Sequence, residues 1–454
     1  MRIDRHYILL IILHIILGWL VFNFRIVSKL YLLSIFCFYL YKIVFSNPSY
    51  RTLYVLKGCA YIVGAEVFIR MTGGSILYEA SKYIVLIFSI LGIFLCEKQK
   101  GIMYYFTYLL FLIPGVLIAG LNTSAETDVR RSIVFNITGP ICIGIFSMFC
   151  YNRKISYKNI YAVLLTITMP LLSMVIYLFL YNTDIQNVVL NTTSNFSTSG
   201  GFGPNQVATI LGLGMFIHAV FFSAYSPSII SKLIHITLLF LMSYRGIITF
   251  SRGGIFTAVI VTLIFYFVYY MSVTAKAKLR IGKFFLFFIG LGFAIWLVSS
   301  YQTKGLIDLR YQNKDVTGRD KEDISTGRSL LLSSELNEFL KHPVFGVGVG
   351  KIKETREKIT GINVVSHNEI SRLLSEHGSF GLLALSLLMI IPLVLHLKNR
   401  SNIFAFPLYV FWFLTINHSA MRIAAPAFIY GLCLLNIQYK NRVSKKENKQ
   451  LHLA

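Results

Sequence analysis

The sequence predicts an all-α protein, a polytopic bundle of membrane helices with one large loop outside the membrane. Of its 454 residues, 56% are hydrophobic and only 14% are charged, whereas soluble domains carry roughly 25% charged residues. Apolar runs such as "YIVLIFSILGIFLC" and "IFTAVIVTLIFYFVYYM" recur from end to end. Many approach the roughly 17 to 25 residues that a helix needs to cross a bilayer. We therefore expect about 12 to 14 transmembrane helices.

Lysine and arginine gather in the short connectors, which fixes the predicted topology. Basic clusters occur in "CEKQKG", "YNRKISYKN", "TAKAKLRIGK", "LKNRSN" and the C-terminal tail. Short loops rich in these residues face the cytoplasm, so both termini are predicted to be cytoplasmic and residues 182–206 and 301–379 to lie on the opposite side. The net charge of +24 then reflects membrane topology. The expected partners include membrane lipids and no nucleic acid.

Four regions follow from this pattern, of which the first is a scaffold of apolar helices and the third is the large outer loop. They are residues 1–181, residues 182–300 with the polar outer loop 182–206, residues 301–379, and residues 380–454 with the last helices and the basic tail. Within the scaffold, Glu66 and Arg70, and likewise Glu79 and Lys82, have the spacing of helical ion pairs. We expect each pair to neutralise itself, because an isolated charge in a bilayer is costly.

Two segments of the large loop are predicted to form amphipathic helices on the membrane surface. The first, "STGRSLLLSSELNEFLKHP", has Ser325 or Thr326 to cap its start and Pro343 to end it. Its apolar side chains share one face: Leu332, Leu336, Phe339 and Leu340. The second, "NEISRLLSEHGSFG", ends at Gly378 before the next membrane helix and has its own apolar stripe: Ile370, Leu373 and Leu374.

Arginines at the ends of apolar segments are candidate ligands for a phosphate or pyrophosphate. Arg245 and Arg252, in "YRGIITFSRGG", end one segment and begin the next. A guanidinium offers a rigid fork of donors that suits phosphate, but arginines at helix ends also bind lipid headgroups. Function is favoured more for Arg252, which has Ser251 before it and two glycines after it. In the loop, Arg328 begins a predicted helix, where backbone N–H groups also favour an anion, whereas Arg319 fits a solvated turn equally well.

The stretch "HPVFGVGVG", residues 342–350, resembles a phosphate-cradling glycine run. Without a preceding strand, a lone GxGxG is weak support for that function. We predict instead that Pro343, Gly346, Gly348 and Gly350 shape the backbone, turning the chain after the first loop helix and letting it pass close to another element.

His367 lies in "VVSHNE" at the start of the second loop helix, just outside the bilayer. A histidine there can accept a proton near neutral pH. Asn368 and Glu369 stand beside it and could orient its ring.

Together these motifs resemble the bacterial O-antigen ligase and O-antigen polymerase superfamily of membrane glycosyltransferases. The resemblance rests on the order of "SRGG" at 251–254, "GR" at 327–328, "HPVFGVGVG", and "HNE" at 367–369 followed by "SEHGSFGLL". The polar "GPNQVA", which contains Asn205, is similar to the Pro-Asn segment of that family. The spacing to Pro343 favours Arg328 over Arg319 as the family's loop arginine.

The resemblance implies transfer of a glycan from an undecaprenyl pyrophosphate carrier to an acceptor hydroxyl on the outer face of the bacterial inner membrane. Arg252 and Arg328 would stabilise the departing pyrophosphate, and His367 would act as general base. Substrate contacts are expected from a wider set: Arg245, Asn205, Asn368, Glu369 and, as the alternative loop arginine, Arg319. No cofactor and no metal are expected, although Asp320, Glu322 and Asp323 form an acidic group outside the membrane.

Three functions remain open on the sequence. A polymerase would use another lipid-linked repeat unit as acceptor, whereas a ligase would use the lipid A core. Ser329 and Glu369 stand where the family often has bulky or aromatic residues. The poor match around His367, at Glu369, favours the polymerase slightly. A lipid-linked glycan transporter or flippase would place its polar residues within the spans, whereas here they gather on the outer face.

Overall fold

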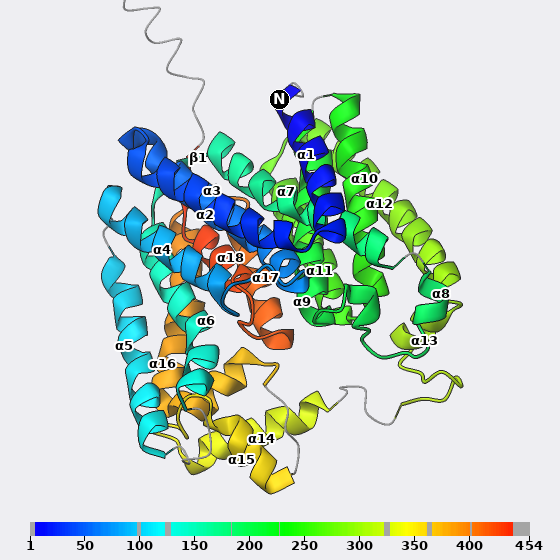
Figure 1. Ribbon diagram of the computed structural model, residues 1–454. Helices are drawn as coiled ribbons and strands as arrows, with labels where there is room; N and C mark the ends of the chain where they lie inside the picture. Colours follow the sequence, from blue (N-terminus) through cyan, green and yellow to red (C-terminus); the bar gives the residue numbers. More distant parts are fainter. Residues whose placement is uncertain are drawn as a thin grey trace, which may run out of the picture.

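The computed structural model describes an almost wholly helical protein (Figure 1). The described residues are 5–97, 101–122, 129–182, 184–226, 228–321, 327–360, 366–399 and 402–438. Within them the chain forms eighteen α-helices and one two-stranded parallel sheet, in which β1 (Lys154–Ser156) pairs with β2 (Asn436–Gln438). The predicted fold class, a polytopic helical membrane protein, is confirmed.

Seven long apolar helices make up the N-terminal scaffold. They are α1 (Arg5–Asn23), α2 (Ile26–Phe45), α3 (Pro48–Met71), α4 (Ala80–Leu95), α5 (Ile102–Asn122), α6 (Val129–Cys150) and α7 (Tyr157–Tyr181). Their starts follow the expected chemistry. The Asn47 side chain accepts from the Ser49 N–H before α3, and Ser156 accepts from the Asn159 N–H before α7.

The second half adds the helices that position the site. The polar loop holds α8 (Ile185–Val188) and a 3₁₀ turn (Ser197–Ser199). The next helices are α9 (Pro204–Val220), which continues into a π-helical turn (Phe221–Tyr225), α10 (Ile229–Ile248), α11 (Arg252–Ser272) and α12 (Ala275–Gln302). The outer segment contains α13 (Leu306–Tyr311), α14 (Arg328–Lys341) and α15 (Lys351–Thr360), and the chain ends with α16 (Glu369–Lys398), α17 (Ala405–His418) and α18 (Ala425–Cys433).

Eleven helices in the described part of the chain are long and apolar enough to cross a membrane. The shorter apolar α4 raises the number to twelve, the lower end of the predicted range. The number lies at the lower end because of the segments near the C-terminus. The apolar segments there form α17 and α18, which are shorter and are packed in the protein core, with Phe411, Trp412 and Phe428 fully buried.

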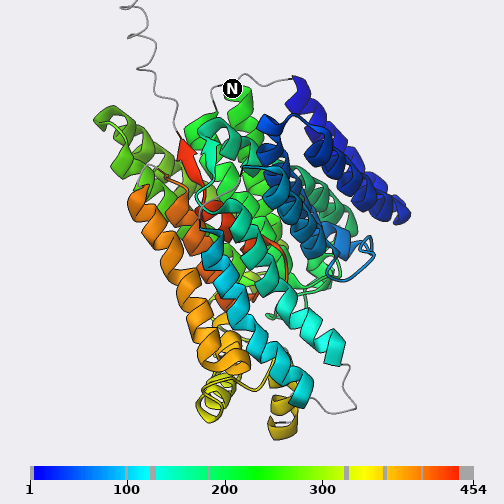
Figure 2. The same ribbon diagram turned by 90° about the vertical axis from the view of Figure 1, so that its left-hand side faces the viewer.

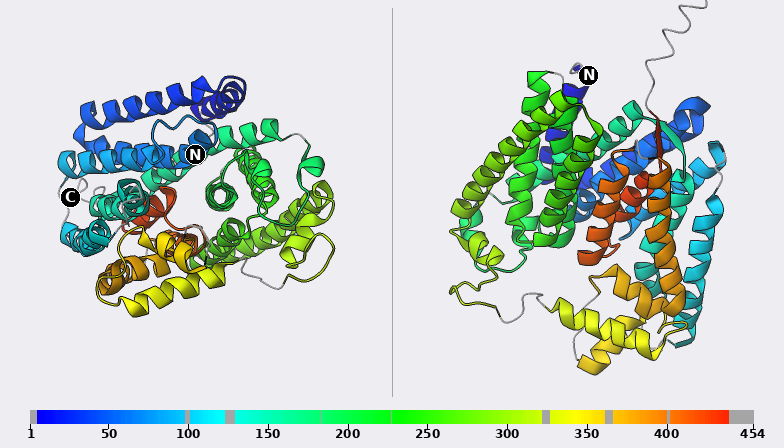
Figure 3. Two further views of the ribbon diagram at one scale, coloured as in Figure 1. Left: turned by 60° about the horizontal axis from the view of Figure 1, so that its bottom comes forward. Right: turned by 180° about the vertical axis from the view of Figure 1, so that it is seen from behind.

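Most of the long helices run between two ends of the molecule, whereas α2 and α3 lie obliquely across them (Figures 1 and 2). α14 and α15 cover one end, with α8 and α13 lying toward it, whereas the start of α1 and the β1–β2 pair lie at the other (Figures 1 and 3). The first and last described segments of the chain therefore share the end opposite the outer loop helices.

Glu66, Arg70, Glu79 and Lys82 of the scaffold pair with one another, as predicted. Arg70 lies 3.4 Å from Glu66, and Lys82 lies 2.5 Å from Glu79. Arg70 also contacts Glu79 at 3.3 Å, which joins the two pairs into one buried network. The network reaches the start of α18, since Glu66 accepts from the Ala424 N–H at 2.6 Å.

Helix α14 ends where the sequence predicts, and the leucines of its predicted apolar face are exposed on the protein surface. Its C-cap is His342, directly before Pro343, while its start at Gly327 follows Ser325 and Thr326, which lie outside the described residues. The side chains buried on α14 are Leu331, Glu335 and Glu338, whereas Leu332, Leu336 and Leu340 are exposed. Polar contacts explain this orientation: Glu335 pairs with Arg356 of α15 at 2.5 Å and accepts from Ser371 of α16 at 2.5 Å.

The start of α16 is also more buried than an amphipathic surface helix would be. Besides Leu373, the helix buries Glu369, Arg372 and Glu376, because Arg372 pairs with both carboxylates on one helix face. Gly378 interrupts the helix with φ of 60° and ψ of −137°, at the position predicted to precede the membrane helix.

The stretch "HPVFGVGVG" passes between α16 and α5, as its predicted role in backbone geometry requires. The N–H groups of Val347 and Gly348 donate to the carbonyls of Ser375 and Glu376, and the Val349 N–H donates to Gly115. The three glycines, Gly346, Gly348 and Gly350, have φ of 71°, 96° and 81°. No phosphate-binding role is needed to account for them.

Gly348→Ala should destabilise the protein more than Gly318→Ala does. A Cβ at Gly348 would lie 2.7 Å from the Ala119 nitrogen, whereas one at Gly318 meets nothing within 4 Å, and both glycines have positive φ. The strained backbone alone costs about 1–3 kcal/mol, and the overlap with α5 adds to it. Thermal unfolding of the detergent-solubilised variants measures the difference; equal melting temperatures would show that α5 yields freely at this contact.

Candidate active site

Four cationic side chains gather where α10, α11, α13 and α14 approach one another. Arg252 is the first residue of α11, Arg310 belongs to α13, Arg328 is the first residue of α14, and Lys321 follows α13. Burial, and then the charges of Arg252 and Arg328, lower the pKa of Arg310 to about 10. Burial and Arg252 likewise lower the pKa of Arg328. These mutual effects place the cations near one another, and we call them the arginine cluster.

The cluster concentrates positive charge, because its four members are all basic. The buried ion pairs at this end of the molecule involve other arginines. Among the described residues, those pairs use Arg356 with Glu335, and Arg372 with Glu369 and Glu376. Several like charges held in a partly buried place raise the free energy of the unliganded protein. An anion bound there would lower it, and guanidinium groups suit phosphate oxygens best.

The corner between α10 and α11 that carries Arg252 is held by the polar loop and by α13. Ser251, the residue that caps α11, donates to the Asn205 side chain at 2.7 Å. Arg310 Nε donates to the Phe250 carbonyl at 3.1 Å. Phe250 has φ of 58°, a conformation that costs about 1–3 kcal/mol in a residue with a side chain. Asn205 thus positions the start of α11, and Arg310 both positions this corner and adds charge.

Arg328 and His367 line one cavity of about 300 Å³, the His367 cavity. Ser366, His367 and Asn368 form one wall just before α16, and Arg328 with Glu335 of α14 forms another. The structure therefore brings together two residues that are 39 positions apart in the sequence. Both are half-buried, so a substrate can reach them.

His367 is a weaker base than its sequence context indicates. Burial, and then the nearby positive charges of Arg422, Arg328 and Arg356, lower its pKa to about 4. The ring is therefore neutral at physiological pH and able to accept a proton, but it does not titrate near neutrality in the unliganded protein.

Part of the sequence that forms this site matches a known protein family. A family model described as O-antigen ligase matches residues 237–386, about a third of the chain. The match contains Arg252, Arg310, Arg328 and His367. Residues 237–386 are thus similar to the O-antigen ligase family. Among curated proteins, none matches the sequence closely enough to count as a relative.

Of the two residues that follow His367, one lines the His367 cavity and the other does not. Asn368 caps α16 by accepting from the N–H groups of Ile370 and Ser371, and it also lines the His367 cavity. Glu369, expected to contact substrate, is buried, pairs with Arg372, and accepts from the Met421 N–H at 3.3 Å. Arg372, three residues further along the same helix, binds the Glu369 carboxylate and holds it inside the protein. Glu369 is therefore not part of the substrate site.

The other two candidate arginines lie outside the His367 cavity. Arg245 is buried near the end of α10, where it donates to the Thr198 carbonyl at 2.9 Å and lies 5.3 Å from the Phe179 ring. It thereby fixes the polar loop, a structural role that the sequence does not reveal. Arg319 is exposed in a turn whose N–H groups bind the Asp315 carboxylate. The structure thus favours Arg328 over Arg319 as the loop arginine at the site.

Two residues of the site were not found from the sequence. Arg310 stands alone in "LIDLRYQ", without a glycine or a motif beside it. Arg422 lies between α17 and α18, where its guanidinium donates to the Ser366 carbonyl and packs 5.6 Å from the Phe135 ring. Both approach the site only through the tertiary fold, so no local spacing indicates them.

The described residues contain no group of three or more His, Cys, Asp or Glu side chains placed to hold a metal ion. Of the acidic group considered from the sequence, Asp320 is exposed. Glu322 and Asp323 lie outside the described residues.

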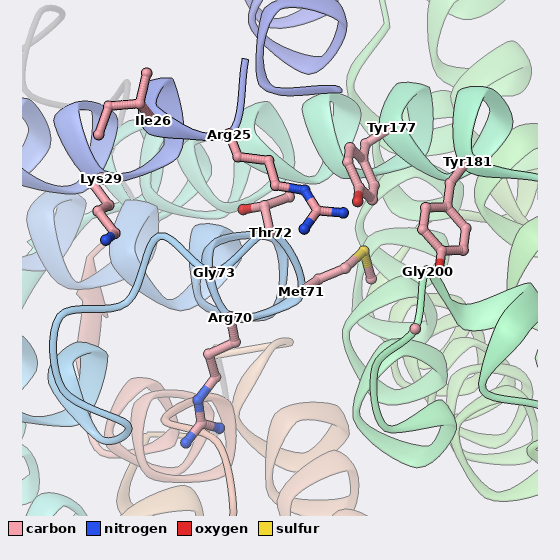
Figure 4. A pocket seen from close by; sticks show the side chains of 11 residues that line it. Arg25, Ile26, Lys29, Arg70, Met71, Thr72, Gly73, Tyr177, Tyr181 and Gly200 are labelled. Atoms are coloured by element: carbon pink, nitrogen blue, oxygen red, sulfur yellow. The ribbon is translucent and has the colours of Figure 1, made fainter. Parts of the chain in front are cut away.

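A basic cavity of about 530 Å³, the Arg25 cavity, lies elsewhere in the scaffold (Figure 4). Arg25 and Lys29 of the α1–α2 region line it together with Tyr177 and Tyr181 of α7. Figure 4 shows the Arg70 guanidinium directed away from Arg25, as its buried ion pairs require. This cavity shares no lining residue with the His367 cavity.

Proposed function

We propose that the protein is an O-antigen polymerase-type glycosyltransferase, which takes its glycan from an undecaprenyl pyrophosphate carrier. The observation that carries the proposal is the placement of Arg328 and His367 on one cavity beside the arginine cluster. A cationic cluster next to a neutral base is what transfer from a pyrophosphate leaving group requires. The exposed leucines of α14, beside Arg328, suit contact with lipid.

The reaction proceeds as a displacement at the anomeric carbon of the donor glycan. The acceptor hydroxyl oxygen bonds to this carbon while the bond from the carbon to the pyrophosphate oxygen breaks. The electron pair of that bond leaves on undecaprenyl pyrophosphate, whose growing negative charge Arg328, Arg310 and Arg252 stabilise. The hydroxyl proton passes to a ring nitrogen of His367, which then releases it to water.

Substrate binding adjusts the strength of the base. The pyrophosphate brings negative charge next to the arginines that lower the His367 pKa in the unliganded protein. Offsetting those charges raises the pKa toward its usual range. His367 is therefore a stronger base when the donor substrate is bound than in the free enzyme.

The surroundings of the site favour a single displacement with inversion at the anomeric carbon. A retaining mechanism needs a free nucleophile, usually a carboxylate. Glu335, the carboxylate that lines the His367 cavity in the described part of the chain, is held by Arg356 and Ser371. The linkage formed should therefore have the opposite anomeric configuration to the glycosyl pyrophosphate.

The choice of polymerase over ligase rests on the departure from the family pattern next to His367, at Glu369. The experiment is the polysaccharide banding pattern of a strain from which this gene is deleted. A single repeat unit on the lipid A core means that polymerase activity is lost, as we propose. Long glycans that are no longer attached to the core mean that the protein is a ligase.

We also propose that transfer needs no metal, since the guanidinium groups supply the positive charge that a divalent ion would supply elsewhere. Transfer by the purified protein should be unchanged by EDTA. A loss of activity that Mg²⁺ or Mn²⁺ restores would contradict this part of the proposal.

A further inference from the structure

A cavity of about 960 Å³ adjoins the His367 cavity. We call it the Tyr78 cavity. Its walls come from the α3–α4 connection with Tyr78, the start of α6 with Phe135 and Asn136, α15, and the buried start of α16. Ser366 lines both this cavity and the His367 cavity. A ligand in the Tyr78 cavity therefore lies next to the residue that precedes the base.

Tyr78 and Phe135 form the aromatic wall of this cavity, and a chain of contacts fixes that wall relative to His367. The rings of Tyr78 and Phe135 lie 6.1 Å apart. Arg422 packs on Phe135 and donates to the Ser366 carbonyl. Arg70 packs 4.2 Å from the Tyr78 ring and donates to the Tyr78 carbonyl at 2.8 Å, so the buried scaffold network holds this side. The wall is thus positioned before any ligand binds.

The charge of the Tyr78 cavity differs from that of the arginine cluster. Its basic and acidic lining residues are equal in number: Arg130, Arg131, Lys353 and Arg372, and Glu79, Glu354, Glu357 and Glu376. A balanced mixture of charges favours a polar, largely uncharged ligand over pyrophosphate. The aromatic faces add surfaces on which the C–H groups of a sugar ring pack, and Tyr78 is 56% exposed.

We propose that the Tyr78 cavity binds the acceptor glycan and presents its hydroxyl to His367. This inference rests on the proposed function, because it requires transfer at the His367 cavity. Donor pyrophosphate and acceptor sugar then occupy separate cavities of opposite character that share Ser366. An acceptor that binds by sugar stacking and hydrogen bonds is selected by its glycan and not by its lipid.

The test varies one aromatic side chain and measures the two substrates separately. The purified full-length protein receives radiolabelled lipid-linked repeat unit as donor. The acceptor, at varied concentration, is the repeat-unit oligosaccharide released by mild acid from the same lipid-linked material. Tyr78→Ala should raise the acceptor KM about tenfold or more, with kcat and the donor KM little changed. Tyr78→Phe, which keeps the ring, should restore most of the acceptor KM.

Tyr181→Ala is the matched control, because Tyr181 is a partly exposed tyrosine that lines the Arg25 cavity. Its acceptor KM should equal that of the wild type. An unchanged acceptor KM in Tyr78→Ala, or an equal rise in Tyr181→Ala, would overturn the acceptor site while leaving transfer intact. If the wild-type protein lengthens no oligosaccharide and releases no undecaprenyl pyrophosphate, the transfer function itself fails, and the acceptor site with it.

Discussion

Arg328→Ala should reduce glycan transfer about 10²- to 10³-fold, the usual cost of removing one donor from a site that stabilises developing charge. Arg328 begins α14, lines the His367 cavity and lies within the influence of Arg252 and Arg310. Its loss removes positive charge from the place where the pyrophosphate departs. In a deletion strain that carries the variant, long-chain polysaccharide should disappear.

Arg319→Ala is the control for this change, since it removes an arginine that also follows a glycine in the same outer segment. Arg319 is exposed in a turn outside the His367 cavity. The Arg319→Ala strain should therefore make polysaccharide of nearly normal length. Both variants should accumulate in the membrane like the wild type, because both residues lie outside the apolar spans. Equal damage from the two substitutions would show that the choice of Arg328 is wrong.

His367→Ala should reduce kcat about 10²- to 10⁴-fold, the range that a positioned general base contributes. The pH profile of the wild type separates this role from a structural one. Because the His367 pKa is lowered to about 4 in the unliganded protein, the base form persists above that pH and is lost as the pH falls through it. The acid limb of kcat/KM, which reports the free enzyme, should lie near pH 4.

The acid limb of kcat, which reports the substrate complex, should lie at a higher pH than that of kcat/KM. Bound pyrophosphate offsets the arginine charges that lower the pKa, so His367 gains a proton more readily in the complex. In the residual activity of His367→Ala, both limbs should be absent. Persistence of the same acid limb in this variant would assign the titration to another group and remove His367 from the role of base.

The fold was predictable from the sequence because a bilayer imposes strong rules on composition. Apolar length predicted the helical bundle, and helical spacing predicted the Glu66–Arg70 and Glu79–Lys82 pairs. Apolar periodicity predicted the leucine face of α14 but not the opposite face, which Glu335 and its partner Arg356 hold against the protein. A buried ion pair between separate helices leaves no local pattern in the sequence.

The site was predictable where the residues lie in motifs and not elsewhere. The order of the "SRGG", "GR" and "HNE" motifs indicated Arg252, Arg328 and His367, and the structure brings Arg328 and His367 onto one cavity. Arg310 and Arg422 reach the site through tertiary contacts alone. The expectation for Glu369 failed because adjacency to His367 does not tell which way the next side chain points, and Arg372 binds it.

The central claim is that the arginine cluster and His367 transfer glycan, and reconstitution of the purified protein tests it most directly. Proteoliposomes with lipid-linked repeat units and no ion gradient should yield longer glycans and one released undecaprenyl pyrophosphate per linkage formed. The same vesicles with Arg328→Ala should yield almost none, whereas Arg319→Ala should match the wild type. Glycans of unchanged length that merely change sides of the membrane would contradict the claim and identify a transporter.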